Sequence, residues 1–264
     1  MPSYKPVTAA LRVLEVLAAV NRLGGRGSIG DIHYQTGIDK STIVRMLETL
    51  ISAGYVIRSV EGPAYRVTGK TLALSASFDR HLAFVDILSP ILSAFRDEIG
   101  WPSDVALFDH DAMLVIETSR ALGPLSFNRS TGYRAPVLGT SLGLAYLAHS
   151  AQEEQERFLE AAREDPAPWN EIAQDREAFE QRMAEVRRQG FATMDPAYSQ
   201  QEYANRIFSI GVPILHDAEV FASLNIIYLR QALTPAKARQ DLLPRLTEVA
   251  AEMGKALAER MSPQ

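Results

Sequence analysis

Residues 36–56 read TGIDKSTIVRMLETLISAGYV and decide the fold of the first part of the chain. Gly37 ends a short helix predicted over 29–36, and Asp39 stands where it can cap the next helix. In that next helix the apolar side chains have the spacing of one buried face; they are Ile43, Met46, Leu47, Leu50 and Ile51. Two helices joined by a tight glycine turn predict a helix-turn-helix unit.

The flanking segments extend this unit. Residues 9–21 predict a first helix, and its expected buried stripe is Leu11, Leu14, Leu17 and Ala18. Residues 55–68, YVIRSVEGPAYRVT, predict two short strands around a Gly-Pro turn, a hairpin. Three helices followed by a hairpin form a winged helix-turn-helix, an architecture that binds DNA.

The outward face of the third predicted helix carries side chains suited to DNA contact. Lys40 and Arg45 can reach phosphate or guanine, while hydroxyl groups at the start of the helix can donate to phosphate. The predicted DNA-binding residues are Lys40, Ser41, Thr42, Val44 and Arg45 in the helix, with Arg58 and Arg66 in the hairpin. The alternative is that these are ordinary solvated charges on a small helical domain.

Charge divides the chain into two parts. The whole chain carries 27 basic and 32 acidic residues, a net charge of −5. Residues 1–70 carry nine basic and five acidic side chains, whereas the remainder has a net charge of −9. A basic first part attached to an acidic remainder fits a phosphate-binding module joined to a domain with another role.

Several classes of site and location are not expected. The chain has no cysteine, which excludes disulfides and thiolate metal sites. Its five histidines do not pair at helical spacing, so we expect no metal site and no cofactor. No stretch approaches the roughly 20 apolar residues of a membrane span. Arg12 and Glu15 interrupt the first apolar stretch, so no signal peptide is expected and the predicted location is cytoplasmic.

The remainder of the chain predicts a mixed α and β domain. Residues 70–84 predict a linker helix, followed by a second helix entered through Pro90. Alternating side chains predict strand hairpins over 103–119 and 206–229 and a short strand over 124–129. Acidic helices are expected at 152–163 and 176–189, and a final helix has the stripe Leu246, Val249, Ala250, Met253 and Leu257.

Residues 139–143, GTSLG, match the G-x-S-x-G pattern of a serine hydrolase. The required chain order is met on paper by Ser141, Asp195 and His216. A nucleophile elbow, however, follows a buried parallel strand, and the elements expected upstream are helices and antiparallel hairpins. We therefore interpret Ser141 as a donor at a helix start, with two glycines that give backbone clearance, and expect no enzyme; serine hydrolysis is the alternative.

The chain resembles the IclR family of bacterial transcription regulators over nearly its whole length. The resemblance is carried by residues 36–56, by APVLGTSLGLAYLA at 135–148 and by SIGVPILHDAEVFASLNI at 209–226. It implies an α+β chain with a winged helix-turn-helix, a linker helix and a GAF-like effector-binding domain. It also implies double-stranded operator DNA and a small organic acid as partners, and a homodimer or a tetramer built from two dimers.

The resemblance also implies domain limits and a pocket. The expected limits are a winged helix-turn-helix at 1–69, the linker helix at 70–84 and the GAF-like domain at 85–264. Carried over position by position, the implied effector-binding residues are Thr140, Ser141, Leu142, Ser199, Ser209, Asn225 and Ile227. Ser199 and Ser209 depart from the family, which often has an acidic residue and a cysteine at these two positions.

Within the family, residues 101–119 and the LSFNR segment at 125–129 most resemble activators of aromatic-acid catabolic operons. The likeness implies that Phe127 and Trp101 line a slot for a ring, with Arg129 or Asn128 meeting a carboxylate or hydroxyl. Core packing is the alternative role of each aromatic residue. The expected function is ligand-responsive control of a catabolic operon; a ligand-free architectural DNA-binding protein is a further alternative.

Overall fold

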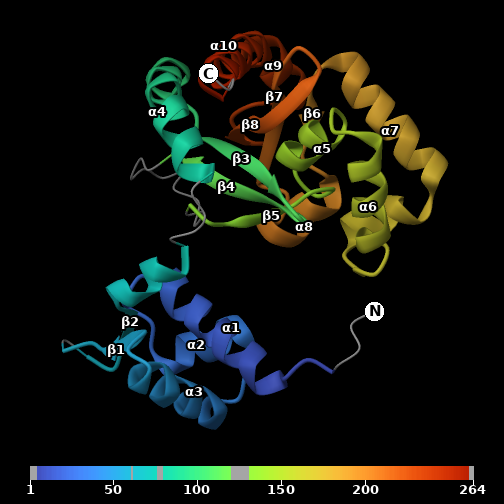
Figure 1. Cartoon of the computed structure of the whole chain (residues 1–264). Coiled ribbons are helices and arrows are strands. Elements are labelled where there is room, and N and C mark those ends of the chain that lie inside the picture. Colours follow the sequence, from blue (N-terminus) through green and yellow to red (C-terminus); the bar gives the residue numbers. More distant parts are fainter. Residues whose placement is uncertain (1–4, 61, 76–79, 120–130, 262–264) are drawn as a thin grey trace. The chain divides into compact units, whose positions relative to one another are not determined.

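The structure is a computed structural model that describes residues 5–60, 62–75, 80–119 and 131–261. The chain divides into two compact units, Met1–Asp79 and Arg80–Gln264 (Figure 1). Each has a hydrophobic core of its own, and each is described by itself below. No helix in the described ranges is long and apolar enough to cross a membrane.

The first unit has three helices and a two-stranded antiparallel hairpin. In chain order its elements are α1 (Thr8–Arg22), α2 (Ile29–Thr36), α3 (Lys40–Ser52), β1 (Val56–Arg58), β2 (Tyr65–Val67) and the 3-10 helix η1 (Gly69–Ser75). The strands pair with Val56 opposite Val67 and Arg58 opposite Tyr65. The predicted winged helix-turn-helix order is confirmed.

Local capping signals set the limits of α2 and α3. Ser28 and Asp31 form a reciprocal capping box at the start of α2, and Gly37 ends that helix with a left-handed φ of 67°. The Asp39 carboxylate accepts from the backbone N–H of Ser41 and begins α3. The caps expected at Gly37 and Asp39 are therefore confirmed.

The buried face of α1 differs from the expected one. Leu11 and Leu14 are 54% and 61% exposed, so the stripe predicted for this helix is wrong. The helix instead packs through Val16, Ala19 and Val20 against α3, which uses the predicted Ile43, Leu47 and Leu50. Two apolar stripes exist on α1, and the tertiary packing buries the one with the smaller side chains.

The segment between the units is not the predicted helix over 70–84. Gly69–Ser75 is a 3-10 helix, and residues 76–79 lie outside the described ranges. Helix α4 then runs from Arg80 to Ile99 with Pro90 inside it, so the expected division into a linker helix ending at 84 and a second helix entered through Pro90 is wrong. Pro90 is tolerated because it is exposed, while Phe84, Leu88 and Leu92 keep one face of the helix buried.

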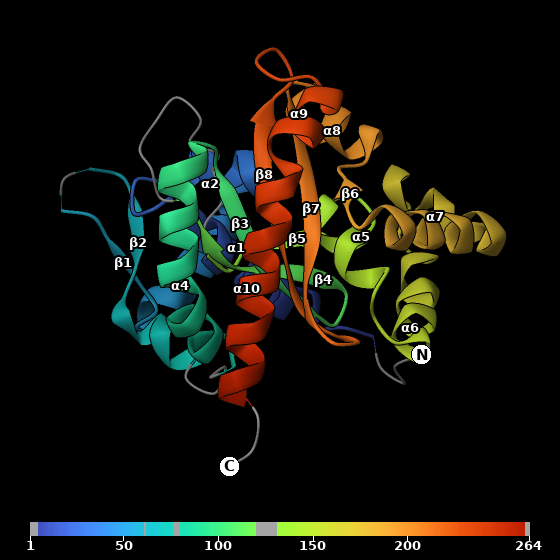
Figure 2. The same ribbon diagram turned by 90° about the horizontal axis from the view of Figure 1, so that it is seen from above.

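The second unit is built on a six-stranded sheet in which every neighbouring pair is antiparallel. The strand order is β5-β4-β3-β8-β7-β6 (Figure 1), and Figure 2 shows β7 and β8 side by side. The strands are β3 (Ser103–Asp109), β4 (Ala112–Thr118), β5 (Arg134–Pro136), β6 (Ala192–Thr193), β7 (Ile207–His216) and β8 (Glu219–Leu229). Both predicted hairpins are confirmed, whereas the strand predicted over 124–129 falls outside the described residues.

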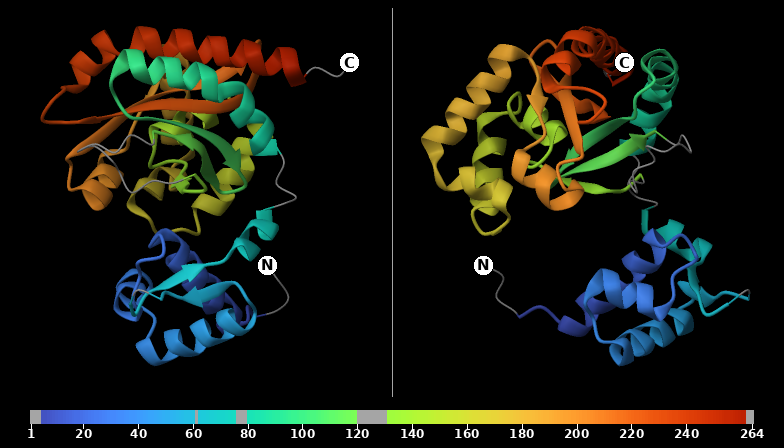
Figure 3. Two further views of the ribbon diagram at one scale, coloured as in Figure 1. Left: turned by 90° about the vertical axis from the view of Figure 1, so that its left-hand side faces the viewer. Right: turned by 180° about the vertical axis from the view of Figure 1, so that it is seen from behind.

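Helices cover both faces of this sheet. Figure 3 shows α4 and α10 (Leu243–Met261) side by side on one face, where the predicted stripe of α10 is buried. The other face is covered by α5 (Ser141–Leu147), α6 (Gln152–Ala162), η2 (Pro168–Gln174), α7 (Arg176–Gln189) and α8 (Pro196–Tyr203). A short α9 (Pro235–Asp241) precedes α10. A sheet with a layer of helices on each face is the predicted α+β domain.

Candidate functional site

One face of α3 is exposed and carries the predicted DNA-binding side chains. Lys40, Val44 and Arg45 are exposed, while the opposite face is buried in the core. Neither Lys40 nor Arg45 forms an ion pair with another described residue. Thr42 is half-buried. The cations of this face are therefore available to an anionic partner.

The N-terminus of α3 is already occupied by a carboxylate. Asp39 Oδ1 accepts from Ser41 N at 2.8 Å and from Ser41 Oγ at 2.5 Å. These hydrogen bonds from the Ser41 hydroxyl and the backbone lower the pKa of Asp39. The Ser41 hydroxyl must therefore leave Asp39 before it can donate to a phosphate.

The two hairpin arginines have different surroundings. Arg58 forms an ion pair with Glu48 of α3, and this pair links the hairpin to α3. Arg66 is exposed and has no ion pair among the described residues. Arg66 is thus the hairpin cation that can reach a DNA backbone without breaking an existing contact.

In the second unit, buried hydroxyl groups meet where α5 begins on the sheet. Ser141 Oγ lies 2.7 Å from Ser209 Oγ of β7, and both side chains are fully buried. Thr140 caps α5 through a bond from Gly143 N at 3.2 Å, and its hydroxyl donates to the Pro136 carbonyl. The structure therefore brings together Ser141 and Ser209, which are far apart in sequence.

A polar row continues across the same face of the sheet. The register sets Asn225 opposite Gly211 on one side and Asp104 on the other. Asn225 Oδ1 accepts from Asp104 N at 2.9 Å, and Thr118 Oγ1 donates to Asp104 Oδ1 at 2.6 Å. No hydrogen bond joins the Asn225 amide nitrogen to another described residue, so this donor is free for a ligand.

Aromatic side chains flank this polar row. The Tyr133 and Tyr198 hydroxyls are hydrogen-bonded at 2.9 Å, and the Trp169 ring meets Tyr198 edge to face with centroids 5.0 Å apart. Ile227 packs in the same cluster as Tyr198. The aromatic rings reach the start of α5, where a Cβ on Gly139 would lie 3.0 Å from the Tyr198 ring and 3.1 Å from the Trp169 ring.

Other predicted effector residues have different surroundings. The Ser199 hydroxyl donates to the Ile207 carbonyl at 2.6 Å and is used within the protein. Leu142 is buried in the core on the α5 face. Trp101 packs against the core on the α4 and α10 face, so it does not join Ser141. Phe127, Asn128 and Arg129 lie outside the described residues.

Sequence reasoning missed Asp104, Thr118, Tyr133 and Tyr198. An acidic residue inside an otherwise apolar strand was the available signal for Asp104, because a carboxylate is seldom buried unless it is paired. Tyr133 and Tyr198 had no comparable signal, since only the tertiary fold brings these residues, 65 positions apart, together.

The surroundings of Ser141 do not form a hydrolase triad. Asp195 caps α8 by accepting from Ala197 N at 2.7 Å. His216 ends β7, five residues beyond the Gly211 that touches Ser141, and five strand residues span about 17 Å. A Cβ on Gly143 would lie 2.1 Å from the Val137 carbonyl oxygen, so this glycine serves close packing. Gly143 gives clearance, as expected.

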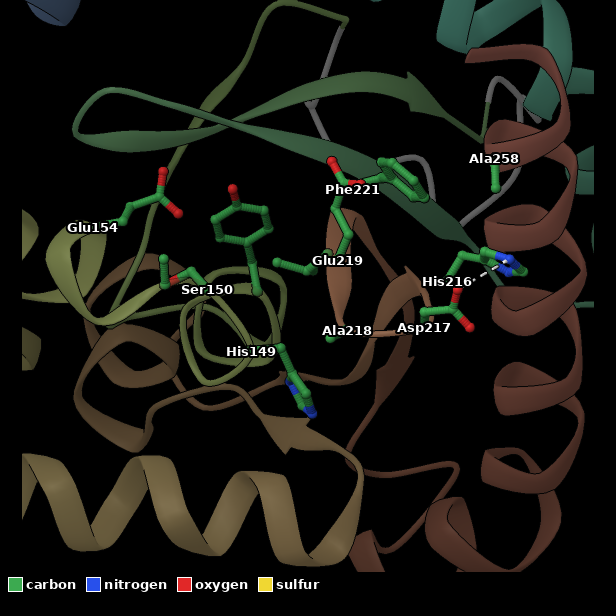
Figure 4. Close-up of a pocket in the computed structure, with 12 residues that line it drawn as sticks. His149, Ser150, Glu154, His216, Asp217, Ala218, Glu219, Phe221 and Ala258 are labelled. Atoms are coloured by element: carbon green, nitrogen blue, oxygen red, sulfur yellow. Dashed lines mark ion pairs between the residues drawn. The ribbon is translucent and has the colours of Figure 1, made fainter. Parts of the chain in front are cut away.

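A cavity of about 810 Å³ opens at the end of the β7–β8 hairpin (Figure 4). His149 and His216 are among its lining residues, and His149 Nδ1 is hydrogen-bonded to the Ala145 carbonyl at 3.0 Å. None of the predicted effector residues lines it. Among the described residues, no group of three histidine or acidic side chains could hold a metal ion.

Comparison with known proteins gives a consistent result. Residues 9–59 match the IclR helix-turn-helix domain, and residues 77–255 match the C-terminal domain of bacterial IclR transcriptional regulators. The chain belongs to the IclR family. It is accordingly a DNA-binding transcriptional regulator, and its relatives among characterised proteins are regulators rather than enzymes.

Individual relatives of this IclR-family chain are distant. The regulator XynR of Escherichia coli is 25% identical over 90% of this chain and 91% of its own length. The Pca operon regulatory protein of Acinetobacter baylyi is 26% identical over 83% and 78%. The match to TsaQ1/TsaQ2 of Comamonas testosteroni, at 28% identity, spans 48% of this chain and about half of that protein, 47%.

Solved structures share the fold. An IclR-family regulator from Brucella abortus has a TM-score of 0.61 at 25% identity, with 96% of this chain and 93% of that chain covered. An IclR homologue from Microbacterium hydrocarbonoxydans, solved with 4-hydroxybenzoate, has a TM-score of 0.66 at 22% identity and covers 95% of this chain and 99% of its own. The predicted fold class and family are confirmed.

Proposed function

We propose that this IclR-family regulator controls a catabolic operon by binding operator DNA through residues 1–69 and a small organic acid through residues 85–264. The single observation that carries the DNA half is the exposed, unpaired Lys40 and Arg45 on α3. A helix of this kind reads base edges in the major groove, while hairpin residues meet the backbone.

To test the proposed DNA binding, the purified full chain is used to select the DNA fragments that it binds from the genome of the host. Arg45→Ala should weaken binding to a selected fragment about fivefold or more, because a lost bidentate base contact costs about 1–3 kcal/mol. Arg22→Ala is the matched control: it removes the same charge from α1, where Arg22 meets Gln35. Equal loss in both variants would show that net charge, rather than α3, carries the binding.

The sensing half is supported by the polar row beneath α5. Ser141, Ser209 and Asn225 place hydroxyl and amide donors on one buried face, and carboxylates accept such donors. Trp169, Tyr133 and Tyr198 beside them favour a ligand with a ring. The 4-hydroxybenzoate bound by the Microbacterium homologue makes aromatic acids the first compounds to test.

A thermal-shift screen of small carboxylates and aromatic acids, including 4-hydroxybenzoate, tests this half. A ligand that binds the folded chain raises its melting temperature by mass action. Ser141→Val should abolish the shift and leave DNA binding intact, whereas Ser223→Ala, a buried serine on β8 whose hydroxyl lacks a partner, should keep it. A flat response across the panel would favour a ligand-free architectural protein.

The exposed face of α1 favours self-association. Val7, Leu11 and Leu14 are all exposed apolar residues, spaced by four and three as in the seam of a coiled coil. A second copy of the same helix fits such a seam, since the apolar rows of two copies complement each other. We propose that the chain forms a homodimer through α1, so that ligand binding shifts the population of dimer arrangements that fit two half-sites.

A further inference from the structure

A small pocket lies at the free edge of the sheet, among residues that the proposed function does not use. Its volume is about 250 Å³, and it lies between the end of α7, the edge strand β6 and the start of α9. Figure 2 shows β6 beside α7 at this edge. Its polar lining consists of Arg182, Glu185, Gln189, Thr193, Tyr228 and Arg239.

Two guanidinium groups at this pocket are not neutralised. Neither Arg182 nor Arg239 forms an ion pair with another described residue. The one carboxylate of the lining, Glu185, is paired with Arg188 of the same helix. Arg239 lies over the Phe191 ring, 5.9 Å from its centroid, which restrains its position. The pocket is therefore locally positive in a unit whose overall charge is negative.

A buried hydroxyl adds a neutral donor. Tyr228 is only 1% exposed, and its hydroxyl makes no hydrogen bond with another described residue. Tyr228 is one of the residues that line this pocket. Burial raises the pKa of Tyr228 to about 12, against a smaller opposing effect of Arg230, so the hydroxyl stays protonated.

We propose that this pocket binds the oxyanion of a small metabolite, a carboxylate or a phosphate group, as a second ligand site of the regulator. Guanidinium groups bind both anions through paired charge-assisted hydrogen bonds. Tyr228 and Thr193, which also line the pocket, add hydroxyl groups that can donate to the remaining oxygen atoms. The pocket shares no residue with the polar row under α5, so the regulator has two separate places for small molecules.

The proposal is tested on the full chain by calorimetric titration with inorganic phosphate and, in a second arm, with acetate. Sodium chloride keeps the ionic strength constant, so that general salt effects cancel. We expect saturable binding of one of the two anions, and the arm that saturates identifies the group. Arg182→Gln combined with Arg239→Gln should weaken it at least about tenfold, and Tyr228→Phe should weaken it less.

Lys237→Gln is the matched control, because it removes one positive charge from α9 at a residue that does not line the pocket. The Lys237→Gln variant should bind the anion with the same affinity as the unmodified chain. Equal weakening in Lys237→Gln and the arginine variants would overturn the proposal, as would absence of saturation by either anion up to about 50 mM. Loss of anion binding in Ser141→Val would also overturn the proposal, since the anion would then occupy the proposed effector site. If Ser141→Val still binds the anion, the edge pocket and the proposed effector site are separate.

Discussion

Single glycines set how closely α5 approaches the chain before it. A Cβ at position 143 would lie 2.1 Å from the carbonyl oxygen of Val137, closer than any real contact. Val137 is buried in the same core as α5, so the backbone around it has little room to shift. The second glycine of the G-x-S-x-G pattern is thus explained by packing.

Replacing this glycine tests that explanation. Gly143→Ala should lower the free energy of unfolding of the second unit by about 3 kcal/mol or more, the upper range for overpacking a close-packed core. Chemical denaturation followed by the fluorescence of Trp101 and Trp169 reports this unit. Glu160→Ala, which introduces an alanine at an exposed position of α6 in the same unit, is the control and should change the transition little. A native-like Gly143→Ala would show that α5 can move.

The cap at Asp39 gives a pH dependence with a definite sign. Hydrogen bonds from Ser41 lower the pKa of this carboxyl in the folded state below its unfolded value of about 3.9. Its stabilising contribution is therefore present above that pH and is lost as the pH falls through the lower folded value.

Hydrogen exchange of the α3 amide groups measures this effect. Between about pH 5 and pH 3, protection in the unmodified chain should fall more steeply than in Asp39→Asn, because asparagine caps a helix without titrating. Asp31, whose pKa is also lowered by its bonds with Ser28, titrates equally in both proteins and cancels in the comparison. Parallel curves would show that Asp39 does not contribute to the acid sensitivity.

At the scale of elements, α1 has two apolar stripes, and only one of them packs in the core. The small residues Val16, Ala19 and Val20 face α3, because they permit close approach of two helices. The larger side chains of Leu11 and Leu14 remain exposed. This division explains how one short helix can complete a core and still leave an apolar surface exposed.

Self-association should depend on the exposed stripe. The double variant Leu11→Gln, Leu14→Gln should shift the chain toward the monomer in sedimentation velocity, with little change in melting temperature because neither side chain is in the core. Leu72→Gln is the matched control, since Leu72 is 74% exposed but lies outside α1. An unchanged sedimentation coefficient in the double variant would place the dimer contact elsewhere.

At the scale of the whole molecule, each unit has its own core. One buried cluster is confined to α1, α2, α3 and the hairpin, while the clusters on the two faces of the six-stranded sheet involve residues 84–257 alone. Units with separate cores generally fold independently. The proposed sensing and the proposed DNA contacts are therefore assigned to units that can be separated.

A fragment of residues 80–264 should consequently keep a cooperative thermal transition by circular dichroism. It should also keep any ligand-induced rise in melting temperature and lose DNA binding. The full chain measured under the same conditions is the reference. A fragment that fails to fold would show that the second unit needs residues before Arg80, against the division seen in the structure.

The sequence by itself determined the elements whose signals are local. The caps at Ser28 and Asp39, the stop at Gly37 and the buried stripes of α3 and α10 were all predictable, because caps and helical periodicity involve residues within a few positions of one another. The strand hairpins were predictable for the same reason. The resemblance to the IclR family was likewise carried by short, continuous stretches of sequence.

Only the tertiary structure decided which surfaces and side chains come together. The buried side of α1, the continuity of α4 through Pro90 and the pairing of Ser141 with Ser209 depend on residues distant in sequence. The Asp104–Thr118 bond and the edge pocket with Tyr228 were likewise invisible, because strand register and helix docking set them. Periodicity in the sequence predicts that one face of a helix or strand is apolar. It does not predict which element covers that face, because the hydrophobic effect is non-directional and burial against any well-fitting apolar partner is favourable.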